Sequence, residues 1–210
     1  MTKFKGLILS GGLFQFSTKG QANILKEFMT FTKCAGFRGR FEFNYVDDKN
    51  YFEDDMTIKQ YLFRDMTNDL SKFDLNQTLE QRNSSHLNEF LFKRFDLDDS
   101  IKQVDHATAK LFSILKSFLA TGQKVLFLNM ESIHFAPGLN ERLARIIKRE
   151  IELKNRTIIV HGELPKQWQP FLKGSFVQLK NKSFEFVQRV TKQEQEVQSF
   201  QELESNKHAA

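Results

Sequence analysis

The stretch Val125-Leu126-Phe127-Leu128-Asn129-Met130-Glu131 decides the fold that we expect for this chain. Four consecutive apolar residues that end at a polar break are typical of a strand buried on both faces of a parallel α/β sheet. Such a strand carries the next side chains to the carboxyl edge of the sheet, where ligands usually bind. We therefore expect Asn129, Met130 and Glu131 to lie at a candidate functional site.

The size and composition of the chain indicate one compact domain. It has 210 residues, of which 40% are hydrophobic, and this is enough to bury a substantial core. No apolar run approaches the roughly 18 to 20 residues that a membrane-spanning helix needs, and residues 1–5 lack the pattern of a signal peptide. We expect a cytoplasmic protein, with a peripheral place at the inner face of the membrane as the other option.

The net charge of +5 hides an uneven distribution of charged residues. Residues 41–105 contain 8 Lys or Arg against 15 Asp or Glu, whereas residues 142–192 contain 12 against 4. An ordinary solvated surface explains this pattern best, and a protein partner or a nucleic acid would suit it as second choices. Paired acids such as Asp54-Asp55 lack the spacing and the central glycine of a calcium loop, so we predict no metal site.

The first part of the chain predicts a strand, a loop, a helix and a second strand. KGLIL (5–9) is interpreted as the first strand, and SGGLFQFSTKG (10–20) as a glycine-containing loop. An apolar stripe through residues 21–33 predicts the helix. RFEFNYV (40–46) alternates as an antiparallel strand does, and residues 47–55 form an acidic turn.

The middle of the chain predicts mainly helices. Residues 56–62 are expected to start a helix with Thr57 as its N-cap, and residues 68–100 to form an irregular helical insertion. Apolar positions over residues 104–119 recur at helical spacing, and Gly122 is placed to end that helix.

The last part of the chain predicts a helix, a second buried strand and a hairpin. An apolar stripe over residues 139–151 predicts a helix rich in basic residues, and TIIV (157–160) predicts the strand. SFVQLKNKSFEFVQRV (175–190) is interpreted as a β-hairpin that turns at Asn181-Lys182. Residues 191–210 are expected to form a polar, flexible tail.

In this order, the elements resemble the nucleotide-binding domain of ABC transporters over residues 5–190. The resemblance implies an α/β fold of the P-loop NTPase kind: a mostly parallel sheet with flanking helices, an N-terminal antiparallel strand pair and a helical insertion. It also implies an ABC ATPase-like domain over residues 1–190, with a helical subdomain at about 57–105. The segments that carry the resemblance are FEDDMTIKQYL (52–62), the helix at 107–119 with Gly122 and the following strand, FAPGLNERL (135–143), IIVH (158–161) and FVQLKNKSF (176–184).

The sequence departs from this family at the motifs that bind and hydrolyse the nucleotide. A working P-loop follows the order G-x-x-x-x-G-K-[ST], so that backbone N–H groups, a lysine and a hydroxyl surround the phosphates. Residues 10–20 have these residue types in another order, and the buried strand is followed by an amide and a thioether in place of two carboxylates. The resemblance thus implies a degenerate nucleotide site at Gly11, Gly12, Ser17, Thr18, Lys19, Asn129, Met130, Glu131 and His161.

The segment in the position of the family's signature motif also departs from it. Asp105-His106-Ala107-Thr108-Ala109 lacks the paired glycines, and Asp105 would repel a phosphate, so we expect Asp105 to cap its own helix. Since the general base, the metal ligand and the P-loop order are all changed, we predict that the chain is not an enzyme and has no catalytic residues. We expect no cofactor, neither ATP nor magnesium.

The resemblance implies a catalytically inactive ABC ATPase-like subunit that associates with a membrane permease or a sister ATPase. An export or immunity-type transporter is the natural setting, and a homo- or hetero-oligomer is the expected assembly. In the family, the helical subdomain receives the permease. The docking residues that this implies are Asp54, Asp55, Thr57 and Tyr61.

A weaker resemblance supports an alternative function. Residues 124–131 and 157–163 resemble the late sheet strands of the ATPase-derived accessory proteins of CRISPR spacer acquisition. That resemblance implies nucleotide-independent binding to the ends of double-stranded DNA. The phosphate contacts would come from Arg142, Arg145, Lys148 and Arg149. These charges share their helix with Glu141, Glu150 and Glu152, so we favour a solvated helix face.

Overall fold

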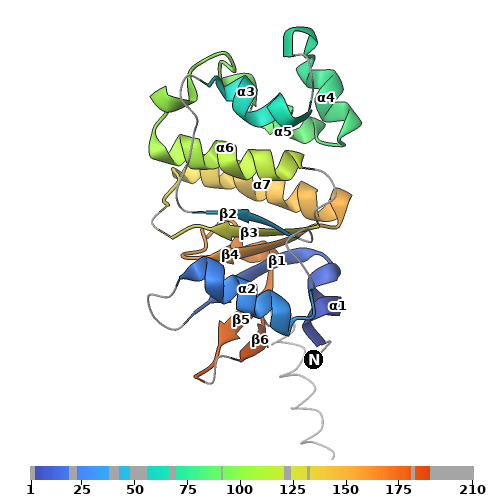
Figure 1. Ribbon diagram of the computed structural model, residues 1–210, viewed down its shortest axis with the longest axis vertical. Helices are drawn as coiled ribbons and strands as arrows, with labels where there is room; N and C mark the ends of the chain where they lie inside the picture. Colours follow the sequence, from blue (N-terminus) through green and yellow to red (C-terminus); the bar gives the residue numbers. More distant parts are fainter. Residues whose placement is uncertain are drawn as a thin grey trace, which may run out of the picture.

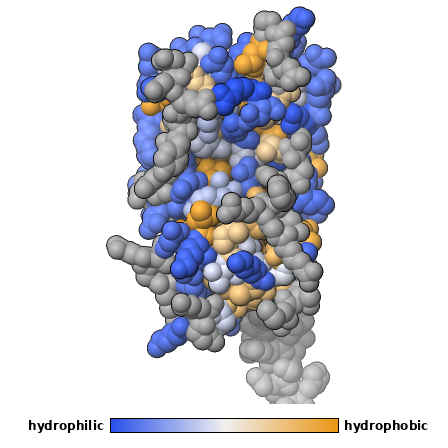
Figure 2. All heavy atoms as spheres, viewed as in Figure 1, coloured by the Kyte–Doolittle hydropathy of each residue, from blue (hydrophilic) through white to orange (hydrophobic). Residues whose placement is uncertain are grey.

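A computed structural model of the chain shows helices on both faces of one β-sheet (Figure 1). The structure describes residues 3–18, 23–37, 43–47, 56–66, 70–90, 92–120, 124–131, 133–180 and 183–189. On the face drawn in Figure 2, hydrophilic residues cover most of the described surface, and hydrophobic residues reach it in scattered places. No helix within the described residues combines the length and the apolar character that crossing a bilayer requires.

The sheet has six strands in the order β2-β3-β4-β1-β5-β6. Strands β1 to β5 pair in parallel, and β6 closes the sheet by pairing antiparallel to β5. The fold class expected from the sequence, an α/β fold with a mostly parallel sheet and flanking helices, is therefore confirmed. The strands are β1 (Gly12–Ser17), β2 (Phe43–Val46), β3 (Val125–Asn129), β4 (Thr157–His161), β5 (Leu172–Gln178) and β6 (Phe184–Gln188).

The helices form a layer on each face of the sheet and a further layer beyond one of them (Figure 1). One face is covered by α1 (Lys3–Leu9) and α2 (Ile24–Cys34), and the other by α6 (His106–Leu119) and α7 (Pro137–Lys154). The helical insertion lies outside α6 and consists of short helices, as expected. Its described α-helices are α3 (Ile58–Phe63), α4 (Leu75–Gln81) and α5 (Ser85–Phe90). The 3-10 turns within the described residues are Arg64–Met66, Leu70–Lys72, Phe92–Arg94, Ile101–Gln103 and Gln169–Phe171.

The prediction of a first strand at residues 5–9 is wrong, because this segment is part of α1. Phe4, Leu7 and Ile8 lie on one side of the helix, at the spacing that helical packing requires, and pack into the core cluster below α2. The first strand is β1, which begins at Gly12, inside the segment interpreted as a loop. Leu13, Phe14 and Phe16 of that segment are buried in the sheet.

The predicted N-terminal antiparallel pair is also wrong. β2 occupies part of the expected segment 40–46, but it runs parallel to β3, with Phe43 beside Val125 and Val46 beside Leu128. A parallel neighbour needs a long crossover connection, and here the insertion and α6 form that connection. The antiparallel pair within the described residues is β5 and β6, as the hairpin prediction expected.

Several other expectations are confirmed. Thr57 is the N-cap of α3, and α6, α7, β3 and β4 lie where the sequence predicts them. Thr57 and Gln60 form a reciprocal capping box, in which each side chain bonds the backbone N–H of the other. The predictions for Gly122, for the turn at residues 181–182, for the tail at residues 191–210 and for most of the acidic turn fall outside the described residues.

The start and the end of the insertion are bonded to each other. Thr57 and Ser100 form an isolated antiparallel bridge, and the Ile101 N–H donates to the Met56 carbonyl at 3.0 Å. The Ile58 N–H donates to the Asp99 carbonyl at 2.9 Å. The insertion therefore leaves the rest of the domain and returns to it at one point.

The two faces of the sheet bury different kinds of side chain. The face below α6 and α7 packs mainly aliphatic residues, including Leu126, Leu128, Ile158 and Val160. The face below α1 and α2 packs an aromatic cluster, in which the rings contact one another at tilted and edge-on angles. Its fully buried members are Phe14, Phe16, Phe28, Phe31, Phe127 and Phe176.

A substitution of Phe127 tests the packing of the aromatic cluster. Its ring centroid lies 3.9 Å from that of Phe28, and its ring stacks on Tyr45. We expect Phe127→Ala to lower the free energy of unfolding, measured by urea titration, by about 3 to 5 kcal/mol. The control Val187→Ala, at a strand position that is 51% exposed, is expected to change it by less than about 0.5 kcal/mol. Equal effects of the two substitutions would contradict the packing described here.

Candidate functional site

Three strands end side by side at the carboxyl edge of the sheet. β4 lies between β1 and β3, with His161 beside Phe16 on one side and beside Asn129 on the other. Ser17 and Thr18 follow Phe16 at the same edge, and Met130 and Glu131 follow Asn129. The structure thus brings together six of the residues predicted for the nucleotide site: Ser17, Thr18, Asn129, Met130, Glu131 and His161.

Asn129 and Met130 are turned into the protein. Asn129 is 3% exposed and its Oδ1 accepts a hydrogen bond from the Glu131 N–H at 3.2 Å. Met130 is 2% exposed, belongs to the aliphatic core, and its N–H donates to the His161 carbonyl at 2.8 Å. Glu131 is the one of the three that points outward, with 57% of its side chain exposed.

His161 bonds both neighbouring strands. Its Nδ1 lies 3.0 Å from the Phe16 carbonyl oxygen, which can only accept a hydrogen bond, so Nδ1 carries a hydrogen. Its Nε2 lies 3.9 Å from Oε2 of Glu131. Gln15 donates from Nε2 to the Gly162 carbonyl at 3.2 Å and adds a second link between β1 and the turn after β4. Sequence reasoning missed Gln15, which the alternation of apolar and polar residues along Phe14–Ser17 would have placed on a strand.

The turn after β4 approaches the turn after β3 closely. Gly162 has φ +100°, and a Cβ at this position would lie 2.9 Å from the Glu131 nitrogen. A side chain here would therefore be strained and would push the two turns apart. Glycine allows His161 and Glu131 to face each other at this edge.

Two predicted site residues lie at the opposite, amino edge. Gly12 pairs with Thr157 at the start of β4, and Lys173 donates from Nζ to the Gly11 carbonyl at 2.6 Å. Gly11 and Gly12 have φ of +73° and +141° and form the turn that leads into β1. They are thus separated from Asn129 by the length of the strands, because β1 starts later in the sequence than the sequence pattern indicated.

The segment in the place of a P-loop is the link between β1 and α2. Lys19, the lysine of the predicted degenerate nucleotide site, falls outside the described residues. The link ends at Asn23, whose Oδ1 accepts the Lys26 N–H at 3.0 Å and caps α2. Sequence reasoning missed this cap. An asparagine directly before the apolar stripe of α2 was the available signal.

The start of α6 is capped by Asp105, as the sequence predicts. Its Oδ1 accepts the backbone N–H groups of Ala107 at 2.9 Å and Thr108 at 3.1 Å, and its Oδ2 accepts the Thr108 hydroxyl at 2.6 Å. The hydrogen bonds from Thr108 lower the pKa of the Asp105 carboxyl below its usual value. A negative charge is thus fixed at the N-terminus of α6.

The predicted docking residues are only partly described. Asp54 and Asp55 fall outside the described residues, and Thr57 is used as a helix cap. Tyr61 is half-buried, and its hydroxyl donates to Oγ of Ser113 at 3.0 Å, while burial raises its pKa. Tyr61 lines a cavity of about 490 Å³ between the insertion, β2 and α6, together with Asn44, Asp65, Arg82 and Lys116.

The basic residues predicted for nucleic acid lie on α7 and are partly neutralised there. Arg145 pairs with Glu141 at 2.6 Å, and Lys148 lies 3.7 Å from Glu152, both one helical turn away. Arg149 is exposed and Arg142 is half-buried. Glu150 does not belong to this solvated face, because its side chain is fully buried.

The chemistry available at the carboxyl edge is that of one exposed carboxylate and one imidazole. Within the described residues, no group of three or more His, Cys, Asp or Glu side chains is placed to hold a metal ion. The other side chains of the edge are the hydroxyls of Ser17 and Thr18, the Asn129 amide, which accepts a backbone N–H, and the buried Met130 thioether.

Neither a protein-family model nor the sequence of a curated protein matches this chain. Solved structures do match its fold. An ATP-binding subunit of an ABC transporter aligns with a TM-score of 0.59 at 15% identity, over 80% of this chain and 74% of that chain. A nucleotide-free ATP-binding cassette from an ABC transporter aligns with a TM-score of 0.56 at 12% identity, over 86% of this chain and 81% of that chain.

A third similar structure is a metal-chelate type ABC transporter in an inward-facing conformation. It aligns with a TM-score of 0.56 at 12% identity, over 85% of this chain and 72% of that chain. Identities this low establish the architecture alone. The chain therefore has the fold of the ATP-binding cassettes of ABC transporters.

Proposed function

We propose that this chain is an ABC ATPase-like subunit that does not hydrolyse ATP and that works through contact with a partner protein. The observation that carries the proposal is the end of β3, where an amide and a thioether, Asn129 and Met130, stand beside the central strands. Magnesium prefers carboxylate and phosphate oxygens, and a general base needs a group that takes up a proton. Neither side chain meets these needs.

The bonding of these side chains supports the same proposal. The Asn129 Oδ1 already accepts the Glu131 N–H, and the Met130 side chain lies in the aliphatic core. Glu131 remains as a carboxylate, but it is largely exposed and faces His161 at 3.9 Å. Phosphoryl transfer depends almost entirely on positioned charges and a metal ion. One exposed carboxylate does not supply them, so these residues do not fit a magnesium nucleotide.

The starts of α2 and α6, which stand where the resemblance would place phosphates, are capped by side chains of the chain itself. Asn23 caps α2 and Asp105 caps α6. A helix N-terminus attracts anions through its free N–H groups and its dipole. An asparagine cap uses one of these groups, and an aspartate cap also repels a phosphate. Both observations support an inactive nucleotide site.

The first test is ATP turnover by protein purified free of contaminating ATPases. We expect release of inorganic phosphate at the rate of a buffer blank, with wild type and Glu131→Gln indistinguishable, because no general base and no metal ligand are in place. Calorimetric titration with ATP, with and without magnesium, is expected to give no heat of binding. Turnover that Glu131→Gln abolishes would overturn the proposal.

The partner that we propose is a membrane permease or a second ATPase subunit of an export or immunity-type transporter. The similar structures include an ATP-binding subunit of an ABC transporter and a whole transporter, and this supports the assignment by analogy of fold. The cavity beside Tyr61 offers a partner a concave surface with charges of both signs, Asp65 and Lys116 among them. The acidic balance of residues 41–105 suits a basic partner surface.

The second test addresses this surface. We expect Tyr61→Ala to weaken binding to a co-expressed partner permease by about tenfold or more, because an aromatic anchor in a pocket carries much of an interface's energy. The dissociation constant would be measured by interferometry on detergent-solubilised permease. Arg145→Gln, on the outer side of α7, is the matched control and is expected to bind as wild type does. Unchanged affinity of Tyr61→Ala would rule out docking at this cavity.

A further inference from the structure

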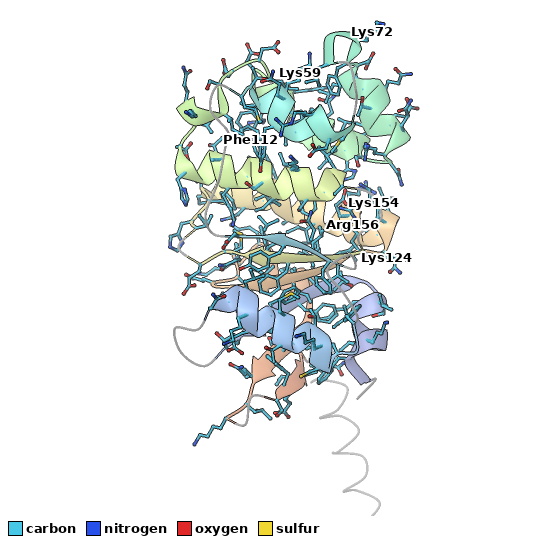
Figure 3. All side chains as sticks on the ribbon, viewed as in Figure 1. Lys59, Lys72, Phe112, Lys124, Lys154 and Arg156 are labelled. Atoms are coloured by element: carbon cyan, nitrogen blue, oxygen red, sulfur yellow. The ribbon has the colours of Figure 1, made fainter. Side chains whose placement is uncertain are left out.

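Strand β6 forms one edge of the sheet. Within the described residues it pairs with β5 and with no other strand, and β2 forms the opposite edge. An edge strand presents a row of backbone groups that can pair with another chain. β6 and the helical insertion lie at opposite ends of the molecule, and Lys59 and Lys72 mark the insertion in Figure 3. A chain that pairs with β6 therefore leaves the cavity beside Tyr61 open.

The backbone groups of alternate residues in β6 point away from β5. The Arg189 N–H donates to the Lys173 carbonyl at 3.1 Å, so Arg189 is bonded to β5. In an antiparallel pair, residues that bond the neighbouring strand alternate with residues that do not. The odd-numbered residues of β6 thus bond β5, and the N–H and C=O groups of Phe184, Phe186 and Gln188 point outward.

The side chains of β6 divide between the two faces of the sheet. Phe184 and Phe186 pack on the aromatic cluster, where Phe184 is buried and Phe186 is half-buried. Glu185, Val187 and Arg189 alternate with them, so they lie on the other face, and all three are exposed. Val187 is 51% exposed, which is unusual for a large apolar residue in this chain. The exposed face of β6 therefore carries an acid, a valine and a base in succession.

We propose that β6 pairs antiparallel with β6 of a second copy of this chain, with Val187 on the two-fold axis, so that the two sheets join into one. In this register, Glu185 lies opposite Arg189 of the second copy. Two-fold symmetry forms the same ion pair again on the other side of the axis. The sequence acid, valine, base is thus complementary to itself when the second strand runs in the opposite direction.

The backbone geometry fits this register. Phe186 lies opposite Gln188 of the second copy, and the outward N–H and C=O groups of these two residues bond each other. Val187 and Glu185 then occupy the non-hydrogen-bonded positions, where the side chains of facing residues lie closest. A shift by one residue would place outward groups opposite groups that already bond β5, so it would lose these hydrogen bonds.

The charges distinguish the remaining registers. A shift by two residues keeps the backbone bonds, but it places Glu185 or Arg189 opposite Val187 and leaves both charges without a facing partner. Opposite charges at facing positions stabilise a sheet, and like charges there destabilise it. Arg189 already donates one N–H to the Gln169 carbonyl, and its guanidinium has further N–H groups for the carboxylate of the second copy.

Sedimentation equilibrium of the full chain, from about 1 μM to about 0.5 mM, tests the pairing, because interfaces below about 1,200 Å² belong to weak, transient complexes. We expect the wild type to pass from monomer to dimer over this range. Glu185→Arg and Arg189→Glu each place like charges opposite each other twice in the dimer. Each is therefore expected to raise the dissociation constant by about tenfold or more.

The double substitution Glu185→Arg with Arg189→Glu restores opposite charges in reversed order, so it is expected to dimerise as the wild type does. Arg145→Glu changes the net charge as Arg189→Glu does, but on α7, and is the matched control with an unchanged dissociation constant. A wild type that stays monomeric would leave this edge to another partner and overturn the proposal. Failure of the double substitution to restore the dimer would overturn it as well.

A cross-linking measurement checks the register without changing a charge. Val187→Cys, combined with Cys34→Ser so that one thiol remains, is expected to form a disulfide-linked dimer under mild oxidation, because position 187 faces itself across the axis. Leu153→Cys in the same background, at a side chain that is 47% exposed at the end of α7, is the control and is expected to stay monomeric. Equal cross-linking of the two variants would contradict the pairing.

Discussion

The parallel pairing of β4 with both β1 and β3 is the constraint on which the other features depend. All three strands bury apolar side chains on both faces, so each must be covered by helices above and below. Parallel strands need crossover connections, and these place α2, α6 and α7 where Figure 1 shows them. The same pairing directs Phe16, Asn129 and His161 to one edge.

The polar groups at that edge mostly bond one another. The Asn129 amide oxygen accepts a backbone N–H of its own turn, and His161 donates to the Phe16 carbonyl. Gln15 and Gly162 add a third link between the strands. Such bonding satisfies groups that would otherwise need water or a ligand, and it fixes the ends of β1, β3 and β4 relative to each other. Preorganisation of this kind needs no bound nucleotide.

Apolar runs were enough to predict β3 and β4, since runs such as Leu126–Leu128 and Ile158–Val160 fit few other environments. Apolar stripes at helical spacing predicted α6 and α7 behind them. The strand predicted at residues 5–9 was wrong because a short apolar segment fits a helix as well as a strand. The packing of Leu7, Ile8 and the preceding Phe4 into the aromatic cluster favours the helix. Gly11 and Gly12 at the start of β1 are residue types typical of a loop, so the sequence pattern did not show where that strand starts. The bond between His86 and Glu150 joins residues 64 positions apart, and no local pattern encodes it.

The bridge between Thr57 and Ser100 closes the helical insertion at its base, and this affects how freely the insertion can change in length. Both ends of the insertion are held side by side. The rest of the chain therefore needs no rearrangement when the insertion becomes longer or shorter. The entropy of closing a loop grows only slowly with the number of residues in it. The helical insertion can therefore change during evolution, for example to bind a different partner protein, while the order of the strands stays the same.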